Sequence, residues 1–248
     1  MINLLQGDCL ELMKDIPDGS VDMILCDLPY GTTKNKWDSV IDMGQMWNQY
    51  KRIIKPNGCI ALFAQNPFGA ELICSNRKMF RYELIWEKTP CTGFLNANRM
   101  PLRAHENILV FYKKLPTYNP QMEKGKLHGR GGYGRLTSNY GNFNTTKRIN
   151  ADEYYPRDIL RFRAENCFGG SRSRLHPTQK PVPLLEYLIK TYTNEGDTVL
   201  DNCMGSGSTG VACVNLNRNF IGMELKGEYF QIAKDRIQEA ETAAMMEG

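Results

Sequence analysis

The stretch Val21-Asp22-Met23-Ile24-Leu25-Cys26-Asp27-Leu28-Pro29-Tyr30 predicts a buried strand that runs into a polar and aromatic turn. Its apolar run has the length of a strand and lies between turn signals, with Asp18-Gly19 before it and Gly31 after it. Ligands meet parallel sheets at the carboxyl ends of strands, so Asp27 and Tyr30 are candidate site residues. A simpler interpretation of these last letters is a strand and a proline turn, in which Asp27 only caps the turn.

Outward from this strand, the chain alternates strand and helix patterns, which is typical of α/β proteins. Its 248 residues suit one large domain or one domain with an insertion. The seven strand candidates are Ile2–Leu5, Val21–Cys26, Gly58–Phe63, Tyr82–Trp86, Asn107–Tyr112, Thr198–Asp201 and Asn219–Glu224, and we expect the fourth and fifth to pair antiparallel. The expected helices are Cys9–Asp15, Met43–Ile54, Val182–Tyr192, one that begins near Ser208 and a last one that carries Phe230, Ala233, Ile237 and Ala240 on one face.

Regular periodicity disappears between residues 113 and 174, which predicts a loop-rich insertion between residues 1–112 and residues 175–248. Residues 124–174 carry eleven Lys or Arg against four Asp or Glu, whereas the rest of the chain has a net charge of −3. Basic side chains among glycines and tyrosines favour a surface for a polyanion, although a solvated or disordered arginine-rich loop has a similar composition. The nucleic-acid-binding candidates are Arg130, Arg135, Lys147 and Arg148.

Several other classes of protein are disfavoured by the sequence. The eight cysteines occur singly, with no C-x-x-C pair, which indicates reduced thiols and a cytoplasmic location. The three histidines are far apart and have no neighbouring cysteine or carboxylate at metal-ligand spacing, so we predict no metal. A basic leader before an apolar run is absent, and so is a run of roughly 18 apolar residues, so neither secretion nor membrane insertion is expected.

A second motif, Gly205-Ser206-Gly207-Ser208-Thr209-Gly210, spells G-x-G-x-x-G between a strand and a helix, and Glu224 ends the next strand. Glycines allow a ligand to approach the backbone, the helix N-terminus offers N–H groups, and a strand-end acid can bind a ribose diol. The same pattern is typical of NAD-binding proteins. A dehydrogenase would leave the Asp27 turn and the basic segment unexplained, and a tight turn without any ligand is the remaining alternative.

With both motifs in view, the chain resembles the DNA amino-methyltransferases that use S-adenosylmethionine, in the motif order of their beta class. A D-P-P-Y-like motif comes first at Asp27, a target-recognition region follows, and the glycine loop comes last at Gly205. Further matches are Gly7-Asp8-Cys9, His176-Pro177-Thr178-Gln179-Lys180-Pro181 and the run from Asp201 to Thr209. The sequence departs from the family pattern at Leu28, where proline is usual, and at Asn202-Cys203, where proline and phenylalanine are common.

The resemblance implies a Rossmann-like methyltransferase fold, with a mixed sheet of seven strands flanked by helices, in agreement with the seven strand candidates. It implies a circularly permuted order, in which the N-terminal strand lies beside the C-terminal ones. The implied substrate is double-stranded DNA, and the implied setting is restriction-modification. The oligomeric state stays open, a homodimer included, and so does any partner nuclease.

The resemblance also implies roles for individual residues. Asp27 and the Leu28 carbonyl would accept the N–H bonds of a flipped adenine, on a turn kept rigid by Pro29, while Tyr30 stacks on the base. Glu224 would bind the ribose hydroxyls of the cofactor and Asp8 its adenine edge. The cofactor's methionine moiety would lie by Asp201 and the backbone from Gly205 to Ser208, with Thr178 and Lys180 near its carboxylate. The full cofactor-binding set is Asp8, Cys9, Asp27, Thr178, Lys180, Asp201, Cys203, Gly205, Ser206, Gly207, Ser208 and Glu224.

Other functions are consistent with parts of this pattern. The nearest is methylation of the N4 amine of cytosine, although Asp27 favours adenine because cytosine members of the family more often have serine there. Methylation of RNA or of a protein glutamine usually goes with asparagine in place of Asp27. A DNA-binding partner without activity should have lost the acid or the glycine loop, and both are intact here.

Overall fold

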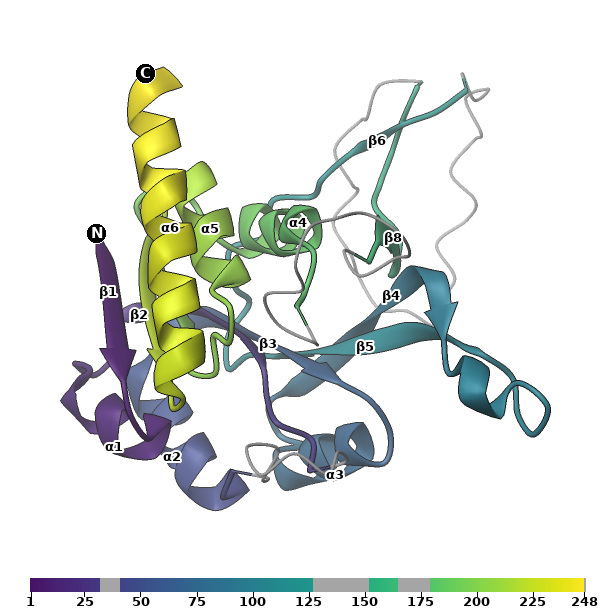
Figure 1. The fold of residues 1–248 in the computed structure, drawn as a ribbon, viewed down its shortest axis with the longest axis horizontal. Coiled ribbons are helices and arrows are strands. Elements are labelled where there is room, and N and C mark those ends of the chain that lie inside the picture. Colours follow the sequence, from purple (N-terminus) through teal and green to yellow (C-terminus); the bar gives the residue numbers. More distant parts are fainter. Residues whose placement is uncertain (32–40, 127–151, 165–178, 248) are drawn as a thin grey trace, which may run out of the picture. The chain divides into compact units, whose positions relative to one another are not determined.

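In the computed structural model of the chain, the described residues are 1–31, 41–126, 152–164 and 179–247 (Figure 1). They divide into two compact units. One consists of Met1–Asn119 with Asp158–Gly248, and the other of Pro120–Arg157. Among the described residues, none of the helices combines the length and the apolar character needed to cross a bilayer.

The first unit is built on a mixed sheet that has eight strands within the described residues, in the order β1-β10-β9-β2-β3-β5-β4-β8. A Rossmann-like α/β fold was predicted, and the sheet confirms it with one strand more than expected. The bounds are β1 (Ile2–Gln6), β2 (Val21–Asp27), β3 (Ile54–Ala64), β4 (Phe80–Thr92), β5 (Arg103–Phe111), β8 (Ile159–Arg163), β9 (Thr198–Asp201) and β10 (Asn219–Glu224).

The pairing of the strands confirms the permuted order. Strand β1 runs parallel to β10, with Ile2 opposite Phe220, so the two ends of the chain supply neighbouring strands. Strands β4 and β5 pair antiparallel, as predicted. Because β1, β10, β9 and β2 are all parallel neighbours, their carboxyl ends meet along one edge of the sheet.

The additional strand, β8, lies in the segment for which only loops were predicted. It pairs parallel with β4, from Ile85 opposite Ile159 to Thr89 opposite Arg163. Leu160 is buried while its neighbours Ile159 and Arg161 are exposed, so the strand follows the usual alternation of a half-buried edge. In this five-residue strand only Leu160 to Arg163 alternate apolar and basic side chains, and this signal is too short to stand out in a basic segment.

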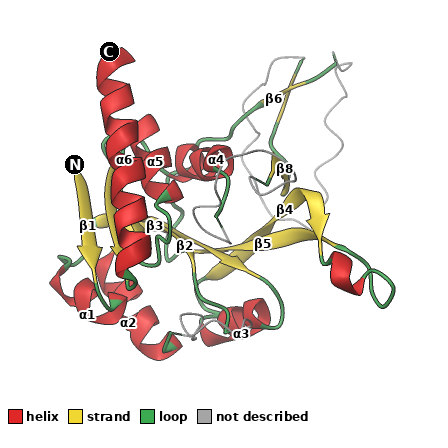
Figure 2. Cartoon of the chain, in the orientation of Figure 1, coloured by secondary structure: helices red, strands yellow, loops and turns green. Residues whose placement is uncertain are grey.

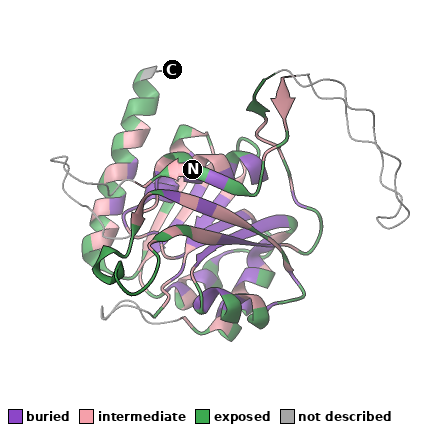
Figure 3. Cartoon of the chain, turned by 90° about the vertical axis from the view of Figure 1, so that its right-hand side faces the viewer, coloured by how far each residue is buried: buried purple, intermediate pink, exposed green. Residues whose placement is uncertain are grey.

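Helices cover both faces of the sheet (Figure 2). One apolar cluster packs α1, α2 and α3 against the sheet through Met46, Tyr50, Phe68 and Leu72, and the other packs α4, α5 and α6 through Leu188, Ala212 and Ile237. Figure 3 shows the buried residues concentrated in the strands between these layers. The bounds are α1 (Cys9–Leu12), η1 (Met13–Asp15), α2 (Met43–Ile53), α3 (Phe68–Ser75), η2 (Phe94–Asn96), α4 (Val182–Tyr192), α5 (Ser208–Asn215) and α6 (Gly227–Glu247).

The second unit contains residues 124–126 and 152–157 of the basic segment, while β8 belongs to the first unit. Strands β6 (Glu123–Lys124) and β7 (Glu153–Tyr154) form a short antiparallel pair. The Tyr154 hydroxyl donates to the Lys126 carbonyl at 2.8 Å, which fastens the ends of this hairpin-like pair. The four basic DNA-binding candidates, Arg130, Arg135, Lys147 and Arg148, lie outside the described residues, so their role stays a prediction.

Candidate active site

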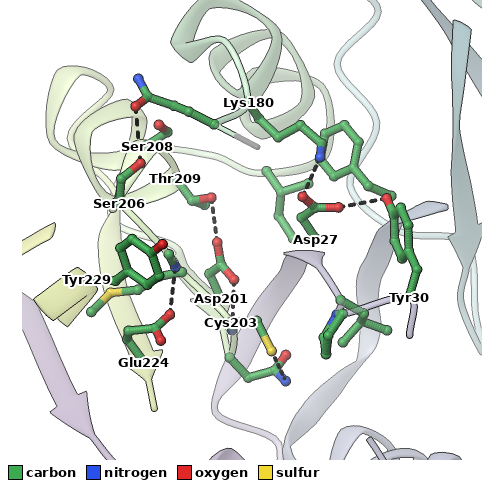
Figure 4. Close-up of a pocket in the computed structure, with 18 of the residues that line it drawn as sticks. Asp27, Tyr30, Lys180, Asp201, Cys203, Ser206, Ser208, Thr209, Glu224 and Tyr229 are labelled. Carbon is green, nitrogen blue, oxygen red and sulfur yellow. Dashed lines mark hydrogen bonds and ion pairs between the residues drawn. The ribbon is translucent and has the colours of Figure 1, made fainter. Parts of the chain in front are cut away.

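A cavity of about 820 Å³ lies at the carboxyl ends of the parallel strands and joins the two sequence motifs (Figure 4). The predicted site residues that line it are Asp8, Cys9, Asp27, Leu28, Pro29, Tyr30, Lys180, Asp201, Cys203, Gly205, Ser206, Ser208 and Glu224. Gly207 lies within the glycine loop but does not line the cavity, and Thr178 lies outside the described residues.

The catalytic candidate Asp27 ends strand β2 and has both carboxylate oxygens engaged. The Tyr30 hydroxyl donates to Asp27 Oδ1 at 2.7 Å, and the Lys180 ammonium forms an ion pair with Oδ2. The Tyr30 ring stacks on Phe68, with centroids 5.1 Å apart, which fixes the direction of its hydroxyl. Leu28, which replaces the usual proline, packs its side chain into the core. The turn therefore presents a carboxylate whose orientation is set from two sides.

A chain of alternating charges continues from Asp27 along one wall of the cavity. Lys180 Nζ also lies 3.4 Å from Glu106 Oε2, and Lys88 Nζ donates to Glu106 Oε1 at 2.7 Å. The side chains of Lys180, Glu106 and Lys88 are only 10%, 11% and 6% exposed. Gln65 Nε2 adds a hydrogen bond of 3.1 Å to Glu106 Oε1. Two cations and two anions thus balance each other in a nearly dry environment.

This cluster shifts the protonation of its members. Burial raises the pKa of Asp27 above its ordinary value, against the opposing effect of the Lys180 ammonium. Burial alone would lower the pKa of Lys180, but the charges of Asp27 and Glu106 raise it overall. For Glu106, burial favours the neutral acid, but Lys180 and Lys88 lower its pKa overall. The lysine therefore helps to keep Asp27 an ionised hydrogen-bond acceptor.

Glu106 and Lys88 belong to the site and were not predicted from the sequence. Glu106 shares a face of β5 with Ile108 and Val110, two buried residues at a spacing of two. An acid at the same two-residue spacing as buried residues indicates an internal charge that has a partner, and this pattern was present in the sequence. The lysine that pairs with it comes from another strand, so the partner could not be identified from the local pattern.

The glycine loop lies opposite Asp27 and depends on glycine at one position above all. Gly207 has φ +78°, and a Cβ there would lie 2.9 Å from the Ala233 backbone in α6. From the same helix, Arg236 donates to the Ser206 carbonyl at 2.5 Å and to the Ser208 hydroxyl at 3.2 Å. Helix α6 therefore holds the loop both by close packing and by a guanidinium clamp, and Arg236 was not foreseen from the sequence.

Asp201, at the end of β9, supports this loop from below. Thr209 Oγ1 donates to Asp201 Oδ2 at 2.6 Å, and the Cys203 amide donates to Oδ1 at 3.1 Å. Burial raises the pKa of Asp201 to about 6, with these donors opposing the rise. Both oxygens are thus used within the protein, which favours a supporting role, and the predicted contact with a ligand is still untested.

Glu224 and Asp8 form the acidic side of the cavity. Glu224 Oε2 accepts from the Gly205 amide at 3.0 Å and Oε1 from the Lys226 amide at 2.8 Å, beside the ring of Tyr229 (Figure 4). Burial raises the pKa of Glu224, and these amides oppose the rise. Asp8 caps α1 by accepting from the Leu10 amide at 2.8 Å, so the helix-cap alternative holds for this acid in addition to its place in the cavity wall.

A known protein family matches most of this chain. The sequence model of a DNA methylase family, the N6 and N4 amino-methyltransferases, matches residues 21–235. The chain belongs to this family. The type II methyltransferase M2.MboI of Moraxella bovis is 28% identical over 96% of this chain and 88% of its own length. The type II methyltransferase M.BglII of Bacillus subtilis is 31% identical over 92% of this chain and 66% of its own length.

Solved structures of other proteins share the fold. The crystal structure of the M1.HpyAVI–SAM complex is 28% identical, has a TM-score of 0.66, and is matched over 96% of this chain and 99% of the other. The cytosine-N4-specific PvuII DNA methyltransferase has a TM-score of 0.68 at 16% identity, over 99% of this chain and 93% of the other. The second likeness shows the fold alone.

The unusual Asn202-Cys203 pair of this DNA methylase is accommodated by a buried polar network. Asn202 is 2% exposed, and the Tyr50 hydroxyl donates to its Oδ1 at 2.5 Å. Its Nδ2 faces the thiols of Cys9 at 3.5 Å and of Cys203 at 3.6 Å. The amide is therefore satisfied on both ends, which removes the cost of burying a polar side chain at this point.

Metal ions were not expected at this site. Within the described residues, no group of three His, Cys, Asp or Glu side chains is arranged to hold one.

Proposed function

We propose that this chain transfers a methyl group from S-adenosylmethionine to the N6 amine of an adenine that is turned out of double-stranded DNA. The family is that of the DNA amino-methyltransferases, and the choice of adenine is the step taken here. The observation that supports the proposed methyl transfer is the position of Asp27. This oriented carboxylate lies in the same cavity as the glycine loop and Glu224. A carboxylate accepts hydrogen bonds only, as an amine donor requires.

The cavity has the groups that S-adenosylmethionine needs. Glu224, held by two backbone amides, keeps acceptor capacity for a ribose diol, and the Tyr229 ring beside it provides an aromatic face. The backbone from Gly205 to Ser208 allows close approach of the methionine moiety. We assign the adenine edge to Asp8, and the methionine carboxylate to Thr178. Lys180 is held against Asp27, which favours a role at the catalytic carboxylate over the contact with the cofactor first expected.

The chemical difficulty lies in the adenine amine, whose lone pair is delocalised into the ring. When bound, the cofactor supplies a methyl group that is already activated as part of a sulfonium. Asp27 and the Leu28 carbonyl accept the two N–H bonds, which lets the nitrogen become pyramidal and directs its lone pair. Asp27 can do this while it is paired because each carboxylate oxygen has two lone pairs. Catalysis then depends on positioning and on a fixed electrostatic environment.

Methylation of the N4 amine of cytosine is the second candidate, because it poses the same problem on a smaller base. Asp27 is the observation that favours adenine, since serine is more usual at this position in the cytosine enzymes. We also propose that the protein works in the reducing cytoplasm as part of a restriction-modification system. Its seven described cysteines are free thiols, and the similar proteins named above are type II methyltransferases.

The test is to incubate the protein with labelled S-adenosylmethionine and plasmid DNA, and then to identify the modified nucleoside and its sequence context. We expect N6-methyladenine at one short recognition sequence. N4-methylcytosine instead would overturn the choice of base, and DNA that stays unlabelled would overturn the proposed activity. The same experiment maps the recognition sequence, which depends on contacts of the basic segment.

A further inference from the structure

The connection between β4 and β5, residues 93–102, exposes large apolar side chains to solvent. Leu95 is 102% exposed, Phe94 54% and Met100 50%. All ten residues from 92 to 101 are exposed, and Figure 1 shows the segment projecting beyond the ends of β4 and β5. Exposed apolar side chains gathered in this way usually mark a surface that binds something.

The backbone of this β4–β5 connection is held by internal hydrogen bonds. The Ala97 amide donates to the Phe94 carbonyl at 3.1 Å, and the amides of Arg99 and Met100 donate to the Asn96 carbonyl at 2.8 and 3.0 Å. Gly93, with φ +93°, makes the turn into the short helix η2. The exposed side chains of Phe94, Leu95 and Met100 form what we call the apolar tip of the connection. Because the backbone under them is compact, inserting the tip into a partner has a lower entropic cost.

The connection starts and ends at the active-site cavity. Thr92 and Arg103 face each other across the last rung of the β4–β5 ladder, and both line the cavity that holds Asp27. Arg103 donates to Gln65 Oε1 at 3.3 Å, and Gln65 donates to Glu106. Whatever the tip binds is therefore held next to the wall that carries the catalytic carboxylate.

The charge of the segment fits DNA. Between Glu87 and Glu106 the sequence has no acidic residue, and Arg99 and Arg103 follow Phe94 and Leu95 in the sequence. An apolar wedge flanked by cations is the combination that proteins insert between base pairs while they hold the adjoining phosphates. A base that is turned out leaves a gap in the stack, and an apolar side chain can fill that gap.

We propose that the β4–β5 connection is a wedge that enters the base stack beside the flipped nucleotide, with Phe94 and Leu95 at its tip. The proposal rests on the proposed function, since it assumes a base that must leave a duplex. The wedge holds the gap open from outside, while Asp27 and Tyr30 hold the base inside the cavity. It therefore helps most when the target base is paired and stacked.

The experiment compares the wild type with the double variant Phe94→Ser, Leu95→Ser on two duplexes that carry the mapped recognition sequence. One duplex is fully paired, and the other has an abasic position opposite the target base, so that extrusion is easier. For the variant, we expect kcat/KM relative to the wild type to fall about tenfold or more on the paired duplex and to stay within about twofold on the abasic one. Leu115→Ser is the matched control because Leu115 is 78% exposed and does not line the cavity.

Two further variants and a second readout separate the outcomes. Leu95→Phe keeps an apolar tip and should retain activity on the paired duplex, and 2-aminopurine at the target position should show less flipping fluorescence with the double variant than with the wild type. An equal loss on both duplexes, or no loss on either, would overturn the wedge. A change from dimer to monomer on sedimentation, with the ratio of the two duplex rates unchanged, would overturn it in favour of self-association. If the wild type methylates neither duplex, the proposed function fails and the wedge fails with it.

Discussion

Asp27 touches two side chains that lie close together in the fold and far apart in sequence, Tyr30 from its own turn and Lys180 from the approach to α4. Tyr30 was predicted as a partner for the base, and the structure adds that its hydroxyl orients the carboxylate. Lys180 was predicted near the carboxylate of the cofactor, which stays a prediction, and the structure adds that it pairs with Asp27. Asp27 is therefore the last member of a cluster of alternating charges along the cavity wall.

Removal of the lysine should shift the pH dependence of methyl transfer. Burial already raises the pKa of Asp27, and Lys180→Met removes the cation that opposes this rise. Asp27 accepts N–H bonds only when it is ionised, so a higher pKa moves the acid limb of the kcat profile to higher pH. We expect a fall in kcat of roughly tenfold for each pKa unit at a pH below the new limb. An acid limb that stays at its wild-type position, matching that of the exposed control Lys114→Met, would contradict this role.

Glu106→Gln should destabilise the fold because it leaves Lys88 and Lys180 without the anion between them. Loss of one member of a buried charged cluster typically costs about 3–5 kcal/mol. The measurement is urea unfolding, with the exposed Glu239→Gln as the control. Since the pKa of Glu106 is lowered in the fold, its contribution is present above the ordinary carboxylate pKa of 4.5 and is lost as the pH falls through the folded-state value. A difference from the wild type that grows on acidification would refute this assignment.

At the scale of elements, helix α6 fixes the glycine loop, which we propose as the part of the cavity that receives the cofactor. It packs Ala233 against Gly207 and reaches Ser206 and Ser208 through Arg236. The loop was predicted from its glycines, and its dependence on a distant helix was not. The position of the loop is therefore a tertiary property and not a local one.

Gly207→Ala tests this packing against a matched control. Gly196 has φ +80°, nearly the +78° of Gly207, but an added Cβ at Gly196 meets nothing within 4 Å. Gly196→Ala should therefore cost only the conformational penalty of about 1–2 kcal/mol. Gly207→Ala adds overpacking against α6, typically about 1–3 kcal/mol more, and should also weaken binding of S-adenosylmethionine. Thermal melting and calorimetric titration measure both quantities, and equal losses in the two variants would disprove the close packing.

The helices and strands differ in how well they could be predicted from the sequence. Seven strands could be predicted from their apolar runs, whereas the permuted order was implied by the family resemblance that the two motifs carry. Strand β8 and helix α3 could not, since β8 is short and basic and α3 is apolar along most of its length without clear periodicity. In the site, Asp27 and Glu224 could be found at strand ends beside turns. Glu106, Lys88 and Arg236 act through partners on other elements, and a single sequence does not report such pairs.

At the scale of the whole molecule, the charge is divided unevenly along the chain. An excess of basic residues lies in the segment 124–174, while the rest of the chain has a net negative charge. The basic segment is therefore expected to supply most of the attraction to DNA phosphates, while the cavity that holds Asp27 lies in the first unit.

Neutralising Arg130, Arg135, Lys147 and Arg148 should weaken DNA binding and flatten its dependence on salt. Each phosphate contact that is lost should reduce the slope of log K against log salt by about 0.9. Fluorescence anisotropy over a range of salt concentrations measures this slope. Four exposed cations elsewhere serve as the control set, namely Lys14, Lys51, Lys114 and Lys234. A slope that is unchanged in the first variant, or equally reduced in the control, would remove the basic segment from the DNA footprint.

The most direct test of the whole account is single-turnover methyl transfer by Asp27→Ala, with labelled S-adenosylmethionine and DNA that contains the mapped site. We expect transfer to be abolished, while the calorimetric affinity for S-adenosylmethionine stays within a few fold of the wild type. Methyl transfer at the wild-type rate by this variant would contradict the claim that the carboxylate at the end of β2 holds the amine that is methylated.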